Sequence, residues 1–143
     1  MARIKIDLPE QFSFSTSIPV RITDINYGGH VGNDSILSLL HEARLKYLTH
    51  LGFSELDIAG AGLIMADVAI EFKGESFYGD ELTVGVAAGE FSKISFEIFY
   101  KMETVRDAKT ILIAKAKTGM VCYDYEKKKV VVVPEEFKKK ALQ

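Results

Sequence analysis

The chain has 143 residues, of which 48% are hydrophobic and 27% are charged, and its formal net charge is −2. This length fits a single domain with a substantial core, so we expect residues 1–143 to form one domain. The near balance of charges argues against nucleic-acid binding, which needs a basic face. No apolar run approaches the roughly 20 residues that cross a bilayer, so we expect no membrane contact.

Cysteine and histidine are scarce in this sequence. The one cysteine, Cys122, has no partner for an internal disulfide, and three scattered histidines add no zinc ligand set. The first ten residues, MARIKIDLPE, lack the apolar core of a signal peptide. We therefore expect a cytoplasmic protein without a metal ion.

The first predicted elements are a strand and a long helix. Alternation in SFSTSIPVRIT predicts a strand over 12–23. The helix is predicted to begin near Asn33 or Asp34, both good N-cap residues, and to run to about His50, where Gly52 ends it. At about 100° per residue, its apolar side chains span about half the circumference, which predicts a helix that a curved sheet covers on several sides.

Strand patterns dominate the rest of the chain. Four long segments have the composition of strands: 63–73, 80–91, 93–103 and 109–124. The short connections YGD and VRDAK predict hairpins and an antiparallel sheet. YDYEKKKVVVV predicts a turn and an edge strand, and PEEFKKKALQ a short helix with Pro134 at its start. Periodicity alone predicts an α+β fold.

Two motifs resemble those of the hotdog-fold thioesterases, in particular the 4-hydroxybenzoyl-CoA thioesterase type. DINYGGHVGN is similar to the family pattern D-x-D-x-x-G-H-V-N-N before the helix, and FKGESFYGDEL is similar to a later pattern that ends in G-D-x-L. The resemblance covers nearly the whole chain. It implies an antiparallel sheet of about five to six strands wrapped around one long central helix.

The same resemblance implies an assembly and an activity. Family members form homodimers or homotetramers whose active sites lie between subunits. They hydrolyse acyl thioesters of coenzyme A or of acyl carrier protein without a cofactor. The chain departs from the motif where its second Asp, the usual catalytic carboxylate, is replaced by Asn26. An amide cannot act as a base or as a carboxylate nucleophile.

Three side chains of the first motif are candidate catalytic residues. Asn26 can orient a water molecule or the thioester carbonyl, or it can serve only an Asx turn. His30 can donate to the carbonyl or act as the base, or it can be a loop histidine bonded to neighbouring backbone. Asp24 can supply the missing carboxylate, but stabilisation of the turn is the favoured interpretation.

A partial resemblance to plant acyl-carrier-protein thioesterases suggests a second candidate carboxylate. Those enzymes add a glutamate on the strand after the helix. That glutamate falls near Glu75, which could replace the missing base. The alternative is that Glu75 is only a solvated residue of a hairpin. Gly28 stands where those enzymes carry an Asn. The backbone N–H groups of Gly32, Asn33 and Asp34 are candidates for an oxyanion site, because unpaired donors and the helix dipole point there. A role of Asn33 or Asp34 as a helix cap is compatible with this.

Three charged residues outside these motifs are of interest. Lys93 falls where related thioesterases place basic residues against the phosphates of coenzyme A, and simple solvation is the alternative. Glu42 and Arg44, in HEAR, correspond to family positions at the dimer contact, and a structural role is favoured for both. Arg44 falls inside the apolar arc of the helix, so we expect it to have a partner.

Three functions fit this sequence unequally. The leading hypothesis is an acyl-CoA thioesterase. A non-catalytic hotdog protein that binds acyl-CoA or acyl carrier protein is the alternative, because the usual Asp is replaced by Asn26. A hotdog hydratase fits less well, since TDINYGGH lacks the Gly–Asp pair and the Pro of the hydratase pattern G-D-x-N-P-x-H.

Overall fold

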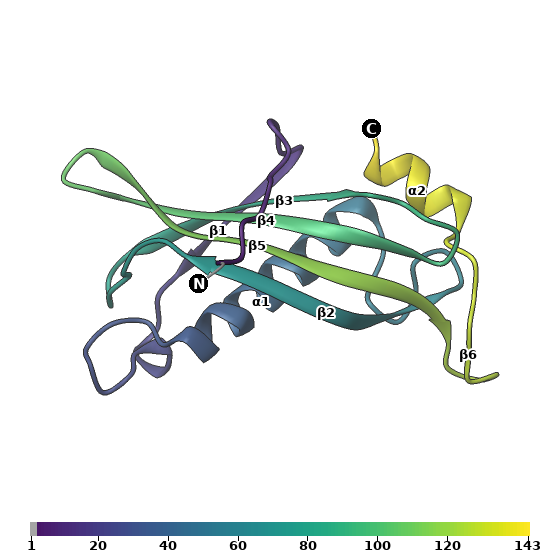
Figure 1. Cartoon of the computed structure of the whole chain (residues 1–143), viewed down its shortest axis with the longest axis horizontal. Helices are drawn as coiled ribbons and strands as arrows, with labels where there is room; N and C mark the ends of the chain where they lie inside the picture. Colours follow the sequence, from purple (N-terminus) through teal and green to yellow (C-terminus); the bar gives the residue numbers. More distant parts are fainter. Residues whose placement is uncertain (1–2) are drawn as a thin grey trace.

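The computed structural model describes residues 3–143 as an antiparallel sheet curved around one long helix, α1 (Figure 1). The strands are β1 (Phe14–Pro19), β2 (Gly62–Phe72), β3 (Glu81–Gly89), β4 (Ser95–Arg106), β5 (Lys109–Asp124) and β6 (Lys129–Val130). They lie in the order β1-β3-β4-β5-β2, and β6 pairs with β5. The helical elements are the 3-10 turn η1 (Ile22–Asp24), α1 (Asn33–Leu51) and α2 (Glu135–Ala141). The expected α+β fold is confirmed.

One predicted hairpin is confirmed and the other is wrong. At VRDAK, Arg106 pairs with Lys109 across a two-residue turn, and Asp107 and Ala108 have φ angles of 53° and 62°. At YGD there is no hairpin, because β2 pairs with β5 whereas β3 pairs with β1 and β4. Residues 73–80 therefore connect the β2 edge of the sheet to a strand near its opposite edge. Local turn residues cannot specify which strands become neighbours.

The first strand and the N-cap of the helix differ from the prediction, whereas α1 begins at Asn33, as expected. β1 ends at Pro19, and the chain then turns through η1, where the Asp24 carboxylate accepts the Arg21 N–H at 2.8 Å. The N-cap of α1 is Gly32, without a side-chain cap, so the expected cap at Asn33 or Asp34 is wrong. Gly52 ends α1 with a φ of 92°, as predicted.

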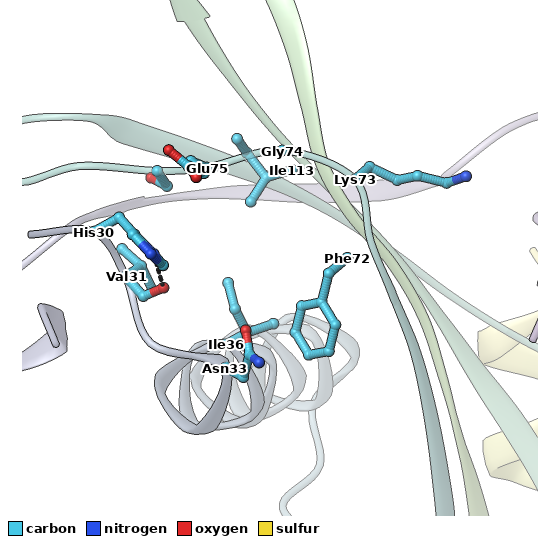
Figure 2. Close-up of a pocket in the computed structure, with 10 residues that line it drawn as sticks. His30, Val31, Asn33, Ile36, Phe72, Lys73, Gly74, Glu75 and Ile113 are labelled. Atoms are coloured by element: carbon cyan, nitrogen blue, oxygen red, sulfur yellow. Dashed lines mark hydrogen bonds between the residues drawn. The ribbon is translucent and has the colours of Figure 1, made fainter. Parts of the chain in front are cut away.

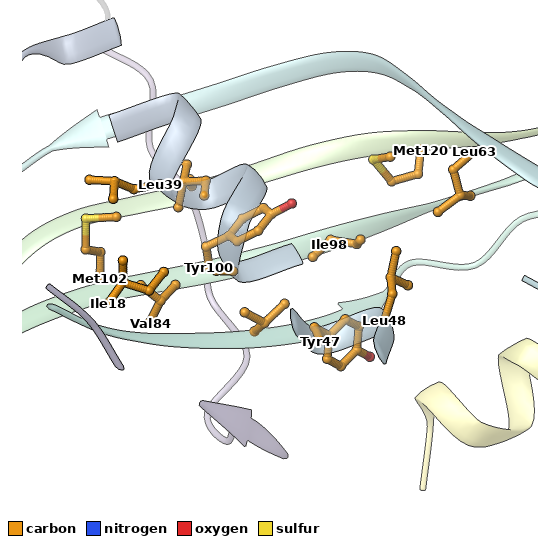
Figure 3. Close-up of a cluster of buried hydrophobic side chains, with 14 of the residues drawn as sticks. Ile18, Leu39, Tyr47, Leu48, Leu63, Val84, Ile98, Tyr100, Met102 and Met120 are labelled. Atoms are coloured by element: carbon orange, nitrogen blue, oxygen red, sulfur yellow. The ribbon is translucent and has the colours of Figure 1, made fainter. Parts of the chain in front are cut away.

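The core lies between α1 and the inner face of the sheet (Figure 3). Leu39, Leu40, Tyr47 and Leu48 of α1 are buried among side chains of β3, β4 and β5. The expected wide apolar face of α1 is therefore explained by the curvature of the sheet around it. No helix among residues 3–143 combines the length and the apolarity that crossing a membrane requires.

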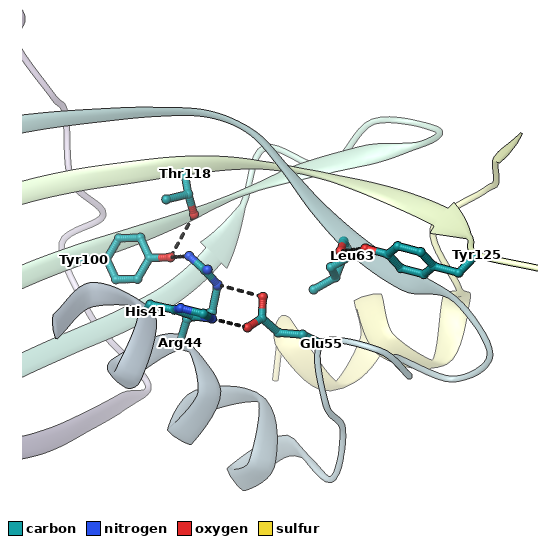
Figure 4. A network of polar contacts seen from close by, with 7 residues as sticks. All are labelled: His41, Arg44, Glu55, Leu63, Tyr100, Thr118 and Tyr125. Carbon is teal, nitrogen blue, oxygen red and sulfur yellow. Dashed lines mark hydrogen bonds and ion pairs between the residues drawn. The ribbon is translucent and has the colours of Figure 1, made fainter. Parts of the chain in front are cut away.

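Arg44 is buried and paired, as expected (Figure 4). Its guanidinium donates to the Tyr100 hydroxyl at 3.2 Å and lies 3.4 Å from a Glu55 carboxylate oxygen. Tyr100 is also bonded to Thr118, and Glu55 is bonded to His41. A buried cation is tolerated in a core only when its charge is matched, as the Glu55 carboxylate does here.

The β2 edge carries apolar side chains that this chain covers only in part. Met65, Val68 and Phe72 are 38%, 38% and 50% exposed. Their partners across the ladder are Met120, Thr118 and Ala114, which are buried in the core, so the β2 side chains point to the same inner face. An open, apolar strand edge is a surface that natural proteins normally cover or pair.

Candidate active site

The glycine-rich corner before α1 is tied to the connection between β2 and β3. Val31 N–H donates to Ser76 O at 2.8 Å, and Gly32 N–H donates to Asp24 O at 3.1 Å. Val31 also forms a bridge with Ile25. These contacts place the two sequence motifs side by side, although they are far apart in the chain.

A cavity of about 270 Å³ opens where the two motifs meet (Figure 2). Three predicted site residues, His30, Asn33 and Glu75, line it together. The remaining lining residues are Val31, Ile36, Phe72, Lys73, Gly74, Ser76 and Ile113. A cavity with apolar walls and a few convergent polar groups is typical of a small-molecule site.

The His30 ring is half-buried and its orientation is set by the backbone. Nδ1 lies 3.1 Å from Val31 O. Because a carbonyl oxygen only accepts, this contact assigns the proton of a neutral ring to Nδ1 and leaves Nε2 as an acceptor. Nε2 lies 3.5 Å from the position that a Cβ on Gly28 would occupy, and Asn26 Oδ1 lies 3.3 Å from the same position. A Cβ at Gly28 would therefore be tight against Asn26 Oδ1 and in van der Waals contact with His30 Nε2.

Asn26 forms the Asx turn that is the alternative to a catalytic role. Its Oδ1 accepts the Gly28 N–H at 2.9 Å, and its own N–H donates to His30 O at 2.9 Å. Asn26 is not among the residues that line the cavity. Its two hydrogen bonds fix the backbone of the corner.

Asp24 is buried, with 3% of its surface exposed, and its carboxylate is held by Arg21. It accepts the Arg21 N–H at 2.8 Å and a guanidinium N–H at 3.2 Å. Asp24 does not line the cavity. These contacts favour the structural alternative, stabilisation of the turn.

The first turn of α1 supplies two of the three N–H groups expected at an oxyanion site. The Gly32 N–H is already bonded to Asp24 O, so this group is not free. The first bond along the helix runs from Ile36 N–H to Gly32 O, which leaves the N–H groups of Asn33 and Asp34 without an acceptor inside the helix. Asn33 itself lines the cavity.

Lys93 lies far from this cavity within one chain. It precedes β4, whose first residue, Ser95, pairs with Val121, whereas the cavity touches β5 at Ile113. Eight residues of an extended strand, at about 3.3 Å each, separate these positions by roughly 26 Å. Lys93 therefore does not line the cavity of its own subunit. Its expected contact with the phosphates of coenzyme A stays a prediction.

Several residues that line the cavity were not among the candidates predicted from the sequence. Phe72 and Lys73 line the cavity and lie within FKGESFYGDEL, so the motif was a usable signal for them. Ile113 comes from the middle of β5, where nothing in its pattern distinguishes it from other core residues. Asp80, the Asp of the G-D-x-L pattern, accepts a guanidinium N–H of Arg106 at 2.7 Å beside the cavity.

The fold and the site together define a hotdog-type protein with a cavity at the amino end of its central helix. A profile of the thioesterase-like superfamily matches residues 20–141. The chain belongs to this superfamily, as its two motifs predicted.

Individual relatives agree with this assignment. The 1,4-dihydroxy-2-naphthoyl-CoA hydrolase of Acaryochloris marina is 32% identical over 123 residues, covering 82% of this chain and 87% of that protein. The acyl-CoA thioesterase YbgC of Haemophilus influenzae is 28% identical over 127 residues, covering 85% and 90%. An X-ray structure of a 4-hydroxybenzoyl-CoA thioesterase variant with 4-hydroxybenzoyl-CoA has a TM-score of 0.80 at 18% identity, covering 90% of this chain and 97% of that one. The last likeness confirms the fold.

Proposed function

We propose that this protein is an acyl-CoA thioesterase, which hydrolyses an acyl thioester to a free acid and coenzyme A. The observation that carries the proposal is the cavity that His30, Glu75 and the amino end of α1 share. Relatives named as CoA thioester hydrolases support the same chemistry. Asn26 stands in the place of the family's usual carboxylate, so the base must come from elsewhere.

We assign the role of general base to Glu75. A water molecule held between the Glu75 carboxylate and His30 Nε2 loses a proton to Glu75 as its oxygen attacks the thioester carbonyl carbon. The negative charge that develops on the carbonyl oxygen is stabilised by the N–H groups of Asn33 and Asp34 and by the dipole of α1. The C–S bond then breaks, and the proton held by Glu75 passes to the leaving thiolate.

The proposed active unit is a homodimer. A second copy that pairs antiparallel along β2 would close the open edge and cover Met65, Val68 and Phe72. Such pairing brings the far end of the partner's sheet toward this chain's cavity. Under this arrangement Lys93 contacts the phosphates of coenzyme A bound in the other subunit's site, which one chain alone does not allow. Light scattering that finds only monomer at micromolar concentration would remove this part of the proposal.

The alternative is a carrier that binds acyl-CoA or acyl carrier protein without turnover. It is favoured by one observation, the amide of Asn26 in its Asx turn where a catalytic carboxylate is usual. The two functions make different predictions for the same assay.

The test is thiol release from a panel of aromatic and aliphatic acyl-CoA substrates. We expect turnover by the parent protein, and a fall in kcat of about 10²–10⁴-fold in Glu75→Gln and His30→Ala variants that retain the fold. Binding of acyl-CoA by calorimetry without thiol release would establish the carrier instead. Unchanged kcat in His30→Ala would remove His30 from the mechanism.

A further inference from the structure

Glu75, the proposed base, lies in the connection 73–80 between β2 and β3, which is anchored by Arg106 of β4. Arg106, the last residue of β4, extends a guanidinium N–H to Glu75 O at 3.1 Å. The same nitrogen donates to the Asp80 carboxylate at 2.7 Å. One side chain thus connects the residue that carries the base with the Asp that ends the loop.

Asp80 also accepts hydrogen bonds from two other residues of this connection. One of its carboxylate oxygens accepts the Phe77 N–H at 2.9 Å and the Ser76 hydroxyl at 3.1 Å, in addition to Arg106. The Arg106 guanidinium also lies 5.0 Å from the centre of the Phe77 ring. Burial raises the pKa of Asp80, but the hydrogen bonds from Arg106, Phe77 and Ser76 outweigh it and lower that pKa below its usual value. Asp80 is therefore charged throughout the neutral pH range.

The anchor also controls the distance between the loop and the His30 corner. Ser76 O accepts the Val31 N–H at 2.8 Å, and Glu75 O accepts from Arg106. The carbonyl groups of two successive residues therefore accept hydrogen bonds from two different parts of the chain, which fixes the backbone from which the Glu75 side chain projects. Asp80 is 13% exposed and Arg106 33% exposed at their side chains, so the pair is partly shielded from water.

We propose that Arg106, with Asp80, is a positioning residue that holds Glu75 in register with His30. The inference rests on the proposed function, since Glu75 is the general base only if the protein hydrolyses thioesters. Misplacement of a reacting group by about 1 Å can cost about 10²-fold in rate. Arg106 does not line the cavity itself, so its effect on catalysis must pass through Glu75.

The test is a double-mutant cycle between Arg106 and Glu75, measured by thiol release. We expect Arg106→Gln to lower kcat by about 10-fold to 10²-fold, while KM changes by less than about 3-fold. Arg106→Lys retains a cation beside Asp80 and should recover part of the loss. In the Glu75→Gln background, Arg106→Gln should cause no further fall in kcat, because the group that it positions is already gone.

Lys117→Gln is the matched control. Lys117 forms an ion pair with Glu97 at 3.2 Å between β5 and β4, and its side chain is 38% exposed, similar to Arg106. It should leave kcat unchanged. Melting temperatures establish that each variant is folded, and Arg106→Lys replaces Arg106→Gln in the cycle if the latter does not fold.

Two results would overturn the proposal and are distinguishable. Equal losses of kcat on Arg106 substitution, with and without Glu75, would show that Arg106 acts independently of Glu75. A parent protein without thiol release on any acyl-CoA would overturn the proposed function and the positioning role with it.

Discussion

Asn26→Asp is the substitution that bears most directly on the missing carboxylate. The variant should fold, because an Asp side chain is nearly isosteric and its carboxylate retains the acceptor for the Gly28 N–H, now 2.9 Å from Asn26 Oδ1. The second oxygen would replace Nδ2, which lies 3.9 Å from the position of a Cβ on Gly32, the N-cap of α1. A negative charge there gains about 0.3–1 kcal/mol from the helix dipole.

The neighbouring carboxylate of Asp34 opposes this gain. The Asp34 Oδ1 lies 2.7 Å from the position that a Cβ on Gly32 would occupy. For two charges about 6 Å apart in a partly hydrated corner, with a dielectric constant of about 40–80, repulsion amounts to about 0.7–1.4 kcal/mol. The two effects nearly cancel, so the free energy of unfolding should change by less than about 1 kcal/mol. The corresponding change in Tm is within about 4 °C.

The effect of Asn26→Asp on activity depends on whether Glu75 is present. In the parent background, a new negative charge near the site disfavours ionisation of Glu75. We expect kcat/KM to fall, and to fall more at pH 6 than at pH 8. In the Glu75→Gln background, the new carboxylate beside His30 supplies a replacement base, and kcat should rise by at least about 10-fold.

The assay is thiol release over a range of pH, with acyl-CoA affinity measured separately by calorimetry. Asn26→Ala is the control that removes the side chain without adding charge. The reasoning is refuted if Asn26→Asp, Asn26→Ala and Glu75→Gln all leave both turnover and affinity unchanged. The corner before α1 would then be only a turn and the start of a helix.

Three further predictions concern stability and reactivity. Ala108→Gly should stabilise the protein by about 0.5–1 kcal/mol in urea unfolding, because Ala108 has a φ of 62° in the β4–β5 turn and glycine adopts it without strain; a destabilised variant would contradict this. Burial raises the pKa of Cys122 to about 11. Its thiol should therefore not react with a disulfide reagent at pH 8 until urea unfolds the chain, and rapid labelling of the folded protein would contradict this. The pKa of Asp80 is lower in the folded protein than the value of about 3.9 for an Asp in an unfolded chain, so its charged form stabilises the fold above that pH. This contribution is lost as the pH falls further. The free energy of unfolding between about pH 5 and pH 2 should therefore decline less steeply in Asp80→Asn than in the parent protein.

Local patterns were sufficient for the type and order of most elements of this fold, but not for the end of β1 or the N-cap of α1. The wide apolar face of α1 predicted the curved sheet, and Gly52 ended the helix where a left-handed residue was needed. The candidate site residues came from the resemblance of the glycine-rich corner and of FKGESFYGDEL to family motifs, and two of them, His30 and Glu75, line one cavity. The helix and the strands depend on spacing and residue type along a short stretch of chain, which a sequence displays directly.

Long-range pairing decided the rest, because it depends on which segments become neighbours in space. The YGD segment has the residues of a hairpin, but β2 pairs with β5, so the segment crosses the end of the sheet and brings Glu75 beside His30. The direction of β4 placed Lys93 at the far end from the cavity and Arg106 next to it. In the sequence, Lys93 began a predicted strand and Arg106 lay in the predicted VRDAK connection. Only the tertiary structure gave Arg106 its place beside the cavity, because it brings the Glu75 carbonyl and the Asp80 carboxylate within reach of one guanidinium.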